Sequence, residues 1–238
     1  MTLEARLPKA RKWANKTLDL LFPPLCAACN KLGSLLCDDC LEKMPWVNGP
    51  ICLRCGRSLL NPANACGSCS QQSFPLQQVR ASLFYREPLA GVIHKMKYNG
   101  LFALAKPLAQ MMAKTWPDWQ PAPDTIIPVP LHKRRIRRRG FNQSALLAFR
   151  VGQQVNISVN DQALKRIRHT LPQVDLSPAD RLENVRGAFT ADAHQVKGQQ
   201  VLLVDDVYTT GATMSAAADA LIASGANGVS AYCLARTV

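Results

Sequence analysis

The hydrophobic pattern of this chain changes near residue 76. Before that point apolar residues are sparse and interrupted by cysteine pairs, whereas after it short apolar runs alternate with stretches of helical periodicity. Short apolar runs indicate buried strands, and apolar residues spaced three or four apart indicate amphipathic helices. The pattern predicts strands at 79–85, 125–129, 200–204 and 229–234, and helices at 89–97, 101–116, 142–154 and 212–224. Such alternation is typical of an α/β fold with a parallel sheet and crossover helices.

Three parts follow from this pattern: 1–24, 25–75 and 76–238. Residues 10–22 in the first part predict a short amphipathic helix, which ends at Pro23 and Pro24. Its short apolar face favours packing on the neighbouring domain over binding to a membrane surface. Residues 166–187 are polar, and we expect them to form a mobile segment.

No apolar run approaches the roughly 20 residues that span a bilayer. The chain also lacks the small-residue cleavage site of a signal peptide. We therefore expect a cytoplasmic protein without a membrane span.

Four CxxC pairs follow one another in the second part of the chain. They contain eight of the nine cysteines: Cys26 and Cys29, Cys37 and Cys40, Cys52 and Cys55, Cys66 and Cys69. Each CxxC turn directs two thiolates to one point, and two turns complete a tetrahedral sulfur site suited to zinc. We therefore predict a double zinc ribbon with two closed, structural zinc sites. Redox-active pairs and an iron–sulfur cluster are the alternatives.

The spacing of the pairs favours sites built from consecutive pairs. Seven residues separate Cys29 from Cys37, and ten separate Cys55 from Cys66, although an interleaved arrangement stays open. Because so short a segment cannot build a sufficient hydrophobic core, metal binding would supply much of its folding free energy. The ninth cysteine, Cys233, lies in a predicted strand, where we expect an ordinary core residue.

The charge of the chain is strongly positive and unevenly distributed. Its 29 lysines and arginines against 16 acidic residues give a net charge of +13, and residues 133–139 alone supply six positive charges. A solvated basic loop that aids solubility is one interpretation of this run. A contact with phosphate or nucleic acid is the other.

The stretch 201–213, with the sequence VLLVDDVYTTGAT, contains a pattern suited to a sugar phosphate. A buried strand is followed by Asp205 and Asp206 at its carboxyl end, where ligands bind in open α/β sheets. Next comes a turn rich in hydroxyl groups that opens a helix, whose backbone N–H groups and dipole attract anions. The aspartates would bind ribose hydroxyls. The residues expected to hold the 5′-phosphate are Thr209, Thr210, Gly211, Ala212 and Thr213.

This stretch resembles the phosphoribosyl pyrophosphate (PRPP) signature of type I phosphoribosyltransferases. Tyr208 departs from that signature, which more often has an aliphatic residue there, and a plain helix cap is the alternative interpretation of the two aspartates. Residues 128–144 (PVPLHKRRIRRRGFNQS) resemble a motif of the ComF family. The similarity to this family extends from about Leu25 to the C-terminus. A second pattern with the same resemblance, RxRxTxxQ…R…N, consists of Arg166, Arg168, Thr170, Gln173, Arg181 and Asn184.

Membership of the ComF family implies a type I phosphoribosyltransferase domain with a PRPP site, together with Mg²⁺. The resemblance implies a catalytic role for Asp205 and Asp206, and a pyrophosphate-binding role for Lys133, Arg134, Arg166 and Arg168. It also implies that 131–140 is a loop that contacts pyrophosphate and that 166–187 closes over it. His132 is either a proton donor, a phosphate contact or a structural residue. Asn142 is expected to cap the helix that follows it.

Three hypotheses of function follow. The first is a PRPP-dependent phosphoribosyltransferase whose acceptor is unidentified. The second is a non-catalytic protein that binds single-stranded DNA. The resemblance supports it, since the ComF family is linked to competence and DNA utilisation. The third is a sensor that binds PRPP or a nucleotide without turnover. The low aromatic content, 6%, argues mildly against a dedicated platform for stacking single strands.

Overall fold

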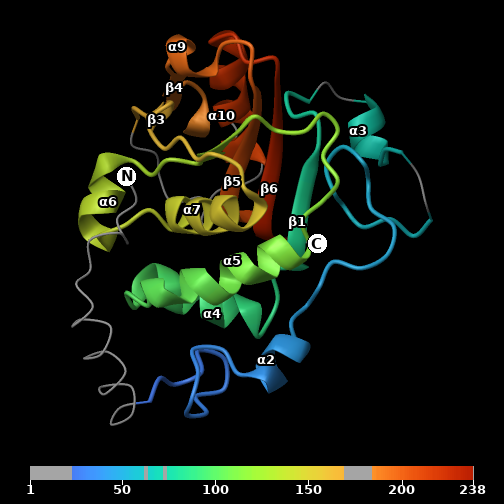
Figure 1. Ribbon diagram of the computed structural model, residues 1–238. Coiled ribbons are helices and arrows are strands. Elements are labelled where there is room, and N and C mark those ends of the chain that lie inside the picture. Colours follow the sequence, from blue (N-terminus) through green and yellow to red (C-terminus); the bar gives the residue numbers. More distant parts are fainter. Residues whose placement is uncertain (1–22, 62–63, 72–73, 169–183, 238) are drawn as a thin grey trace.

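Four parallel strands form the central sheet of the part of the chain that follows the cysteine-rich segment (Figure 1). The computed structural model describes residues 23–61, 64–71, 74–168 and 184–237. The strands follow the order β1-β6-β5-β2, and all neighbours are parallel. Their bounds are β1 Val79–Phe84, β2 Thr125–Pro128, β5 Gln200–Tyr208 and β6 Gly228–Arg236. All four strands predicted from the sequence are therefore confirmed.

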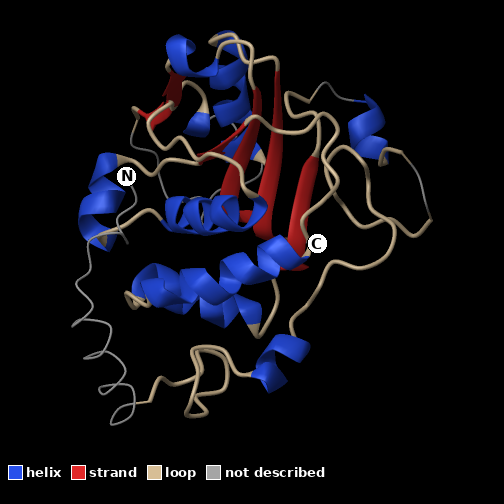
Figure 2. Cartoon of the chain, in the orientation of Figure 1, coloured by secondary structure: helices blue, strands red, loops and turns tan. Residues whose placement is uncertain are grey.

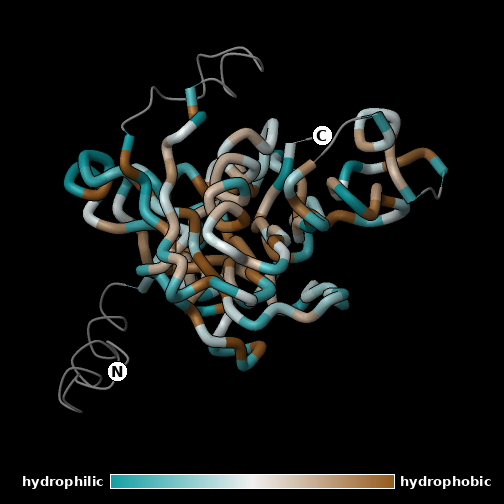
Figure 3. Tube along the Cα trace, turned by 90° about the horizontal axis from the view of Figure 1, so that it is seen from above, coloured by the Kyte–Doolittle hydropathy of each residue, from teal (hydrophilic) through white to brown (hydrophobic). Residues whose placement is uncertain are grey.

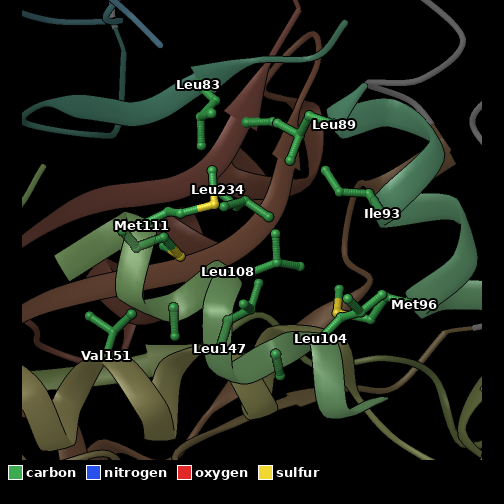
Figure 4. Close-up of a cluster of buried hydrophobic side chains, with 14 of the residues drawn as sticks. Leu83, Leu89, Ile93, Met96, Leu104, Leu108, Met111, Leu147, Val151 and Leu234 are labelled. Carbon is green, nitrogen blue, oxygen red and sulfur yellow. The ribbon is translucent and has the colours of Figure 1, made fainter. Parts of the chain in front are cut away.

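Helices cover both faces of this sheet, which explains why its strands are apolar on both sides. One face packs on α4, α5 and α7, in a cluster that includes Leu202, Val204 and Leu234 (Figure 4). The other face packs on α10, in a cluster that includes Leu203 and Cys233. The helix bounds are α4 Leu89–Tyr98, α5 Ala105–Lys114, α7 Gln143–Val155 and α10 Ala212–Ala223, with a 3₁₀ turn η2 Phe102–Leu104 before α5.

The two clusters together form the interior of the α/β region. Figure 3 shows hydrophobic residues concentrated in the middle of this region and hydrophilic residues along its outer turns. Cys233 is completely buried there, which confirms that it is an ordinary core residue. Within the described residues, none of the helices combines the length and the apolar character that crossing a membrane requires.

A small antiparallel pair of strands, which the hydrophobic pattern did not predict, lies beside the main sheet. It consists of β3 Leu164–Arg166 and β4 Phe189–Ala191, and α9 Ala193–Val196 follows it. Three-residue strands are too short to produce a recognisable alternation of apolar and polar positions. The sequence between them includes 169–183, which lies outside the described residues, as does the predicted helix at 10–22.

The basic run predicted as a loop at 131–140 contains a helix instead, α6 Lys133–Arg139. Arginine and lysine have high helix propensity, and the run contains neither glycine nor proline before Gly140. The His132 side chain caps the first turn by accepting a hydrogen bond from the Arg134 amide at 3.3 Å. Gly140 ends the helix in the left-handed conformation, with φ of 86°. The expectation of a loop was wrong because these local helix signals outweigh the charge repulsion.

The cysteine-rich part attaches to the α/β region at two separate places. It contains two short helices, α2 Asp38–Glu42 and α3 Gly67–Gln71. Figure 2 shows α2 below the α4 and α5 helices and α3 at the side of the sheet. Main-chain hydrogen bonds join the cysteine-rich part to β1 at two positions, from the Val47 amide to the Ser82 carbonyl and from the Val79 amide to the Arg54 carbonyl.

Candidate functional site

A cavity of about 510 Å³ lies at the carboxyl ends of the parallel strands. Its wall contains residues at or just beyond the end of each strand: Tyr85 after β1, Val129 after β2, Tyr208 at the end of β5 and Thr237 after β6. This is the edge at which open α/β sheets bind ligands. The remaining wall comes from the last turn of α4, from α6, from the start of α7, from β3 and from residues 205–214.

The two aspartates lie within this cavity, and each has a partner from another element, half-buried Lys97 for Asp206 and buried Ser144 for Asp205. Asp206 forms an ion pair with Lys97 of α4, with 2.5 Å between Oδ2 and Nζ. Burial is the largest influence on the pKa of Lys97 and lowers it, but the charge and hydrogen bond of Asp206 together with the charge of Asp205 outweigh it, and the net shift is upward. The Asp205 Oδ1 atom accepts hydrogen bonds from the Ser144 hydroxyl at 2.5 Å and from the Asp206 amide at 2.8 Å.

Asp205 resists ionisation in this environment. Burial raises its pKa most, and the neighbouring charge of Asp206 adds to the effect. The hydrogen bond from Ser144 and the charge of Lys97 oppose the shift, and the resulting pKa is about 7. The pair therefore forms a carboxylate site whose charge changes near neutral pH.

The sequence analysis missed Lys97 and Ser144. Lys97 is one of two lysines in the last turn of a helix, and Ser144 is the second residue of another helix. Neither position differs in sequence from an ordinary surface or capping position. A single sequence therefore contains no signal for them.

The predicted phosphate loop lines the cavity along its full length, from Thr209 to Thr213. β5 extends beyond the predicted strand 200–204 to Tyr208, because its pairing with β6 continues to Arg236. Gly211 then adopts a left-handed conformation with φ of 82° and begins α10. A side chain here would collide with the Tyr208 ring, since a Cβ would lie 2.8 Å from its Cζ. Glycine is therefore required at this turn.

A wall of arginines faces the two aspartates. Arg135, Arg138 and Arg139 of α6 line the cavity together with Arg166 of β3. Their spacing in α6 places the first three on one helical face. Burial lowers the pKa of Arg135, and the charges of Arg139 and Arg138 lower it further. The pKa of Arg166 is lowered to about 10 by burial and by Arg135. A polyanion in the cavity would relieve this repulsion.

The predicted pyrophosphate residues occupy different places in the structure. Arg166 lies in the cavity wall, whereas Lys133, Arg134 and Arg168 are not among the described residues that line it. Arg168 donates a hydrogen bond to the Asn184 carbonyl at 3.0 Å. Because α6 is a helix, its residues do not present their side chains interchangeably, and the helical register selects which ones face the cavity.

Two further predicted residues have structural roles. The Asn142 side chain accepts a hydrogen bond from the Ser144 amide at 3.1 Å and donates one to the Val129 carbonyl at 3.0 Å. It therefore caps α7, as predicted, and fixes the helix to the end of β2. His132 caps α6 and does not line the cavity within the described chain.

The eight paired cysteines form two tetrads from consecutive pairs. Tetrad 1 contains Cys26, Cys29, Cys37 and Cys40, and tetrad 2 contains Cys52, Cys55, Cys66 and Cys69. The sulfur atoms within each tetrad lie within 4.8 Å of one another. Backbone amides donate to sulfur in both, from Cys37 to Cys26 Sγ at 3.5 Å and from Cys66 to Cys52 Sγ at 3.3 Å. These bonds stabilise thiolates, so the donor set fits a tetrahedral metal.

Comparison with known proteins identifies both parts of the chain. A family described as a double zinc ribbon domain matches residues 17–70, and one described as a phosphoribosyl transferase domain matches residues 148–237. The DNA utilization protein YhgH of Escherichia coli strain K12 is 32% identical over 229 residues, which are 92% of this chain and 100% of that protein. Competence protein F of Haemophilus influenzae is 32% identical over 208 residues, which are 84% and 90% of the two chains.

This chain belongs to the ComF family. Another similar relative is competence protein ComFC of Bacillus subtilis, which is 29% identical over 216 residues, 85% of this chain and 84% of that protein. The family, the phosphoribosyltransferase fold and the double zinc ribbon predicted from the sequence are therefore confirmed. The zinc-ribbon match, together with the closed geometry of both tetrads, supports structural zinc over redox pairs or an iron–sulfur cluster.

Proposed function

We propose that this ComF protein binds PRPP in the cavity and transfers its phosphoribosyl group to an acceptor, with release of pyrophosphate. The observation that carries the proposal is the convergence of three features at one sheet edge: paired carboxylates, a glycine turn that opens α10 and an arginine wall. PRPP has ribose hydroxyls, a 5′-phosphate and a pyrophosphate, which match these three features in turn.

The proposed arrangement assigns one part of the ligand to each part of the cavity. Residues 209–213 hold the 5′-phosphate through backbone N–H groups and hydroxyls. Asp205 and Asp206 accept hydrogen bonds from the ribose hydroxyls and stabilise positive charge that develops on the ribose. Lys97 neutralises one of the two carboxylates, which reduces their repulsion of the phosphate groups.

The arginine wall would hold pyrophosphate as it leaves. Arg135, Arg138, Arg139 and Arg166 supply its positive charge, and roles for Lys133, Arg134 and Arg168 remain predictions. Mg²⁺ suits the carboxylate oxygens of Asp205 and Asp206, and when bound it would supply charge neutralisation of the leaving group.

Calorimetric titration with PRPP and Mg²⁺ tests this proposal. We expect the wild type to bind and the Asp205→Asn/Asp206→Asn variant to lose at least about 10-fold in affinity, the equivalent of about 1.4 kcal/mol. Asp219→Asn is the matched control, because it removes a carboxylate of α10 that lies outside the cavity lining. Absence of binding to the wild type would refute the proposal.

A second titration distinguishes the arginine wall from the phosphate loop. Ribose 5-phosphate retains the 5′-phosphate but lacks pyrophosphate. The variant Arg135→Gln/Arg139→Gln should therefore weaken PRPP binding while leaving the affinity for ribose 5-phosphate nearly unchanged. A screen of nucleophilic acceptors for pyrophosphate release then distinguishes turnover from PRPP sensing. Release with one of the acceptors means turnover, and binding without release means sensing.

Direct binding of single-stranded DNA is a second candidate function, favoured by aromatic residues beside the arginine wall. Tyr98 is 58% exposed and Phe102 is 62% exposed. The Arg139 guanidinium lies over the Tyr98 ring at 5.2 Å, and Phe102 meets Phe141 edge to face. Aromatic rings with adjacent cations are suited to stacked bases. Fluorescence anisotropy with a labelled oligonucleotide tests this function, which requires binding that weakens steeply with salt and is lost in Phe102→Ala.

A further inference from the structure

Arg236, the last residue of β6, is a buried cation without a carboxylate partner in the described chain. Only 5% of it is exposed. The ion pairs among the described residues join Lys31 to Asp39 and Lys97 to Asp206, and neither involves Arg236. A buried charge is costly unless hydrogen bonds and opposite charge compensate it. The structure therefore needs a local source of negative potential near this guanidinium.

Tetrad 2 supplies that potential. The Arg236 Nη1 atom donates a hydrogen bond to the Cys55 carbonyl at 2.6 Å. Four thiolates around one divalent zinc carry a net charge of about −2. Arg236 lies close to the turn that follows Cys55, since a Cβ on Gly56 would lie 3.1 Å from Arg236 Nη1. With zinc bound, the charge of tetrad 2 would therefore stabilise the buried Arg236 guanidinium.

The other side of Arg236 contacts the phosphate loop through Tyr208. The guanidinium carbon lies 5.6 Å from the centre of the Tyr208 ring, and the two residues are register partners in β5 and β6. The ring is buried and lies directly against Gly211. Burial also raises the pKa of the Tyr208 hydroxyl, so the ring stays neutral. The ring therefore packs directly against the turn at Gly211.

We propose that Arg236 is a positioning residue that connects the zinc at tetrad 2 with the phosphate loop. The metal site orients the guanidinium, the guanidinium orients the Tyr208 ring, and the ring supports the turn at Gly211. This inference rests on the proposed binding of a phosphorylated sugar at that loop. It goes further because it makes the affinity for the 5′-phosphate depend on tetrad 2 and not on tetrad 1.

Arg236→Gln tests the link on the ligand side. We expect this variant to weaken the binding of ribose 5-phosphate and of PRPP by a similar factor of about 5–20, because both ligands use the same loop. Arg86→Gln is the matched control. The Arg86 guanidinium also lies over an aromatic ring, that of Phe84 at 5.4 Å, but Arg86 is not among the described residues that line the cavity. Equal losses in the two variants would overturn the proposal.

A double-mutant cycle with Tyr208→Leu determines whether the two residues act as one unit. The double variant should bind ribose 5-phosphate only slightly more weakly than either single variant, because each single change already breaks the chain of contacts. Fully additive losses would overturn the link. If Arg236→Gln does not fold, Arg236→Lys replaces it, because lysine keeps the charge but loses the planar stacking group.

Hydrogen exchange of the ligand-free full-length protein tests the link without any ligand. Cys69→Ser, which removes a ligand of tetrad 2, should speed exchange of the amides at 209–213. Cys29→Ser, at an exposed position of tetrad 1, should leave them unchanged. If the wild type binds no phosphorylated sugar, the proposed function fails. The exchange pattern still tests whether tetrad 2 is connected to the loop 209–213 through Arg236. Unchanged exchange at 209–213 in Cys69→Ser and Arg236→Gln would overturn it.

Discussion

The two cysteine tetrads have the same ligands in the same arrangement, yet they attach to the protein by different forces. Tetrad 1 is part of the main hydrophobic cluster, in which Cys26 and Cys40 pack with Met44 and with the helices α4 and α5. Tetrad 2 belongs to a small cluster of its own. Its contacts with the α/β region are polar and include guanidinium-to-carbonyl bonds from Arg80 to Leu53 and from Arg236 to Cys55.

The difference suggests different roles for two equivalent metal sites. Hydrophobic contact depends on buried area and is not directional, so tetrad 1 should mainly add to global stability. Hydrogen bonds from guanidinium groups fix both distance and angle, so tetrad 2 can transmit geometry to the loop beside it. The CxxC pattern is the same in both cases and carries no information about this difference.

The largest expected effect separates the two tetrads by thermal stability. Cys40→Ser and Cys69→Ser remove equally buried ligands, each 7% exposed. We expect each variant to keep one of two zinc ions. The melting temperature of Cys40→Ser should fall at least about 5 °C more than that of Cys69→Ser, because losing the metal of tetrad 1 opens the main core. Metal analysis and calorimetry measure both quantities, and equal melting temperatures would contradict the comparison.

Met44→Ala probes the apolar attachment of tetrad 1. Met44 is 4% exposed and packs in the main cluster. Its truncation should lower the free energy of unfolding by about 2–4 kcal/mol, since it leaves a cavity. Arg80→Gln, its counterpart at tetrad 2, should cost only about 1 kcal/mol. Urea denaturation of both variants provides the comparison, which would be reversed if the arginine variant lost more stability.

Asp205→Asn tests whether the buried charge of Asp205 in the cavity lowers the free energy of unfolding. The pKa of Asp205 is about 7 in the folded protein, against about 3.9 in the unfolded chain. The folded state therefore binds the proton more tightly, and the stability contributed by this group falls as pH rises from about 4 to 7. At pH 8 the full cost is present, and the substitution removes it.

We expect Asp205→Asn to raise stability by about 2 kcal/mol at pH 8, or roughly 4–8 °C in melting temperature. At pH 5 the gain should shrink to roughly a third, because the folded wild type already holds the proton. Thermal unfolding at the two pH values measures the difference. A gain that is equal at both would show that Asp205 is ionised throughout.

The smallest effect is expected at the exposed ion pair of tetrad 1. Lys31 and Asp39 lie 3.0 Å apart, and both side chains are 65% exposed. Solvent screens such a pair, so Lys31→Gln should leave the melting temperature within about 1 °C of the wild type and keep both zinc ions. A larger decrease would show that polar contacts also hold tetrad 1, which would weaken the contrast with tetrad 2.

The sequence by itself determined the parts of this protein that depend on local spacing. Four CxxC pairs indicated two metal sites, and the order of strand, Asp205, Asp206 and glycine turn indicated the phosphate loop. These patterns are readable because their residues are near neighbours in the chain. Single positions within a pattern, such as Asn142 as a helix cap, were predictable for the same reason.

The tertiary structure alone decided which distant residues complete the site. The packing of α4 and α7 against β5 brings Lys97 to Asp206 and Ser144 to Asp205. The register of α6 selects the arginines that line the cavity. Arg236 reaches Cys55 across 181 positions of sequence. Such contacts depend on how layers pack and strands align, and the local spacing of residues does not encode either.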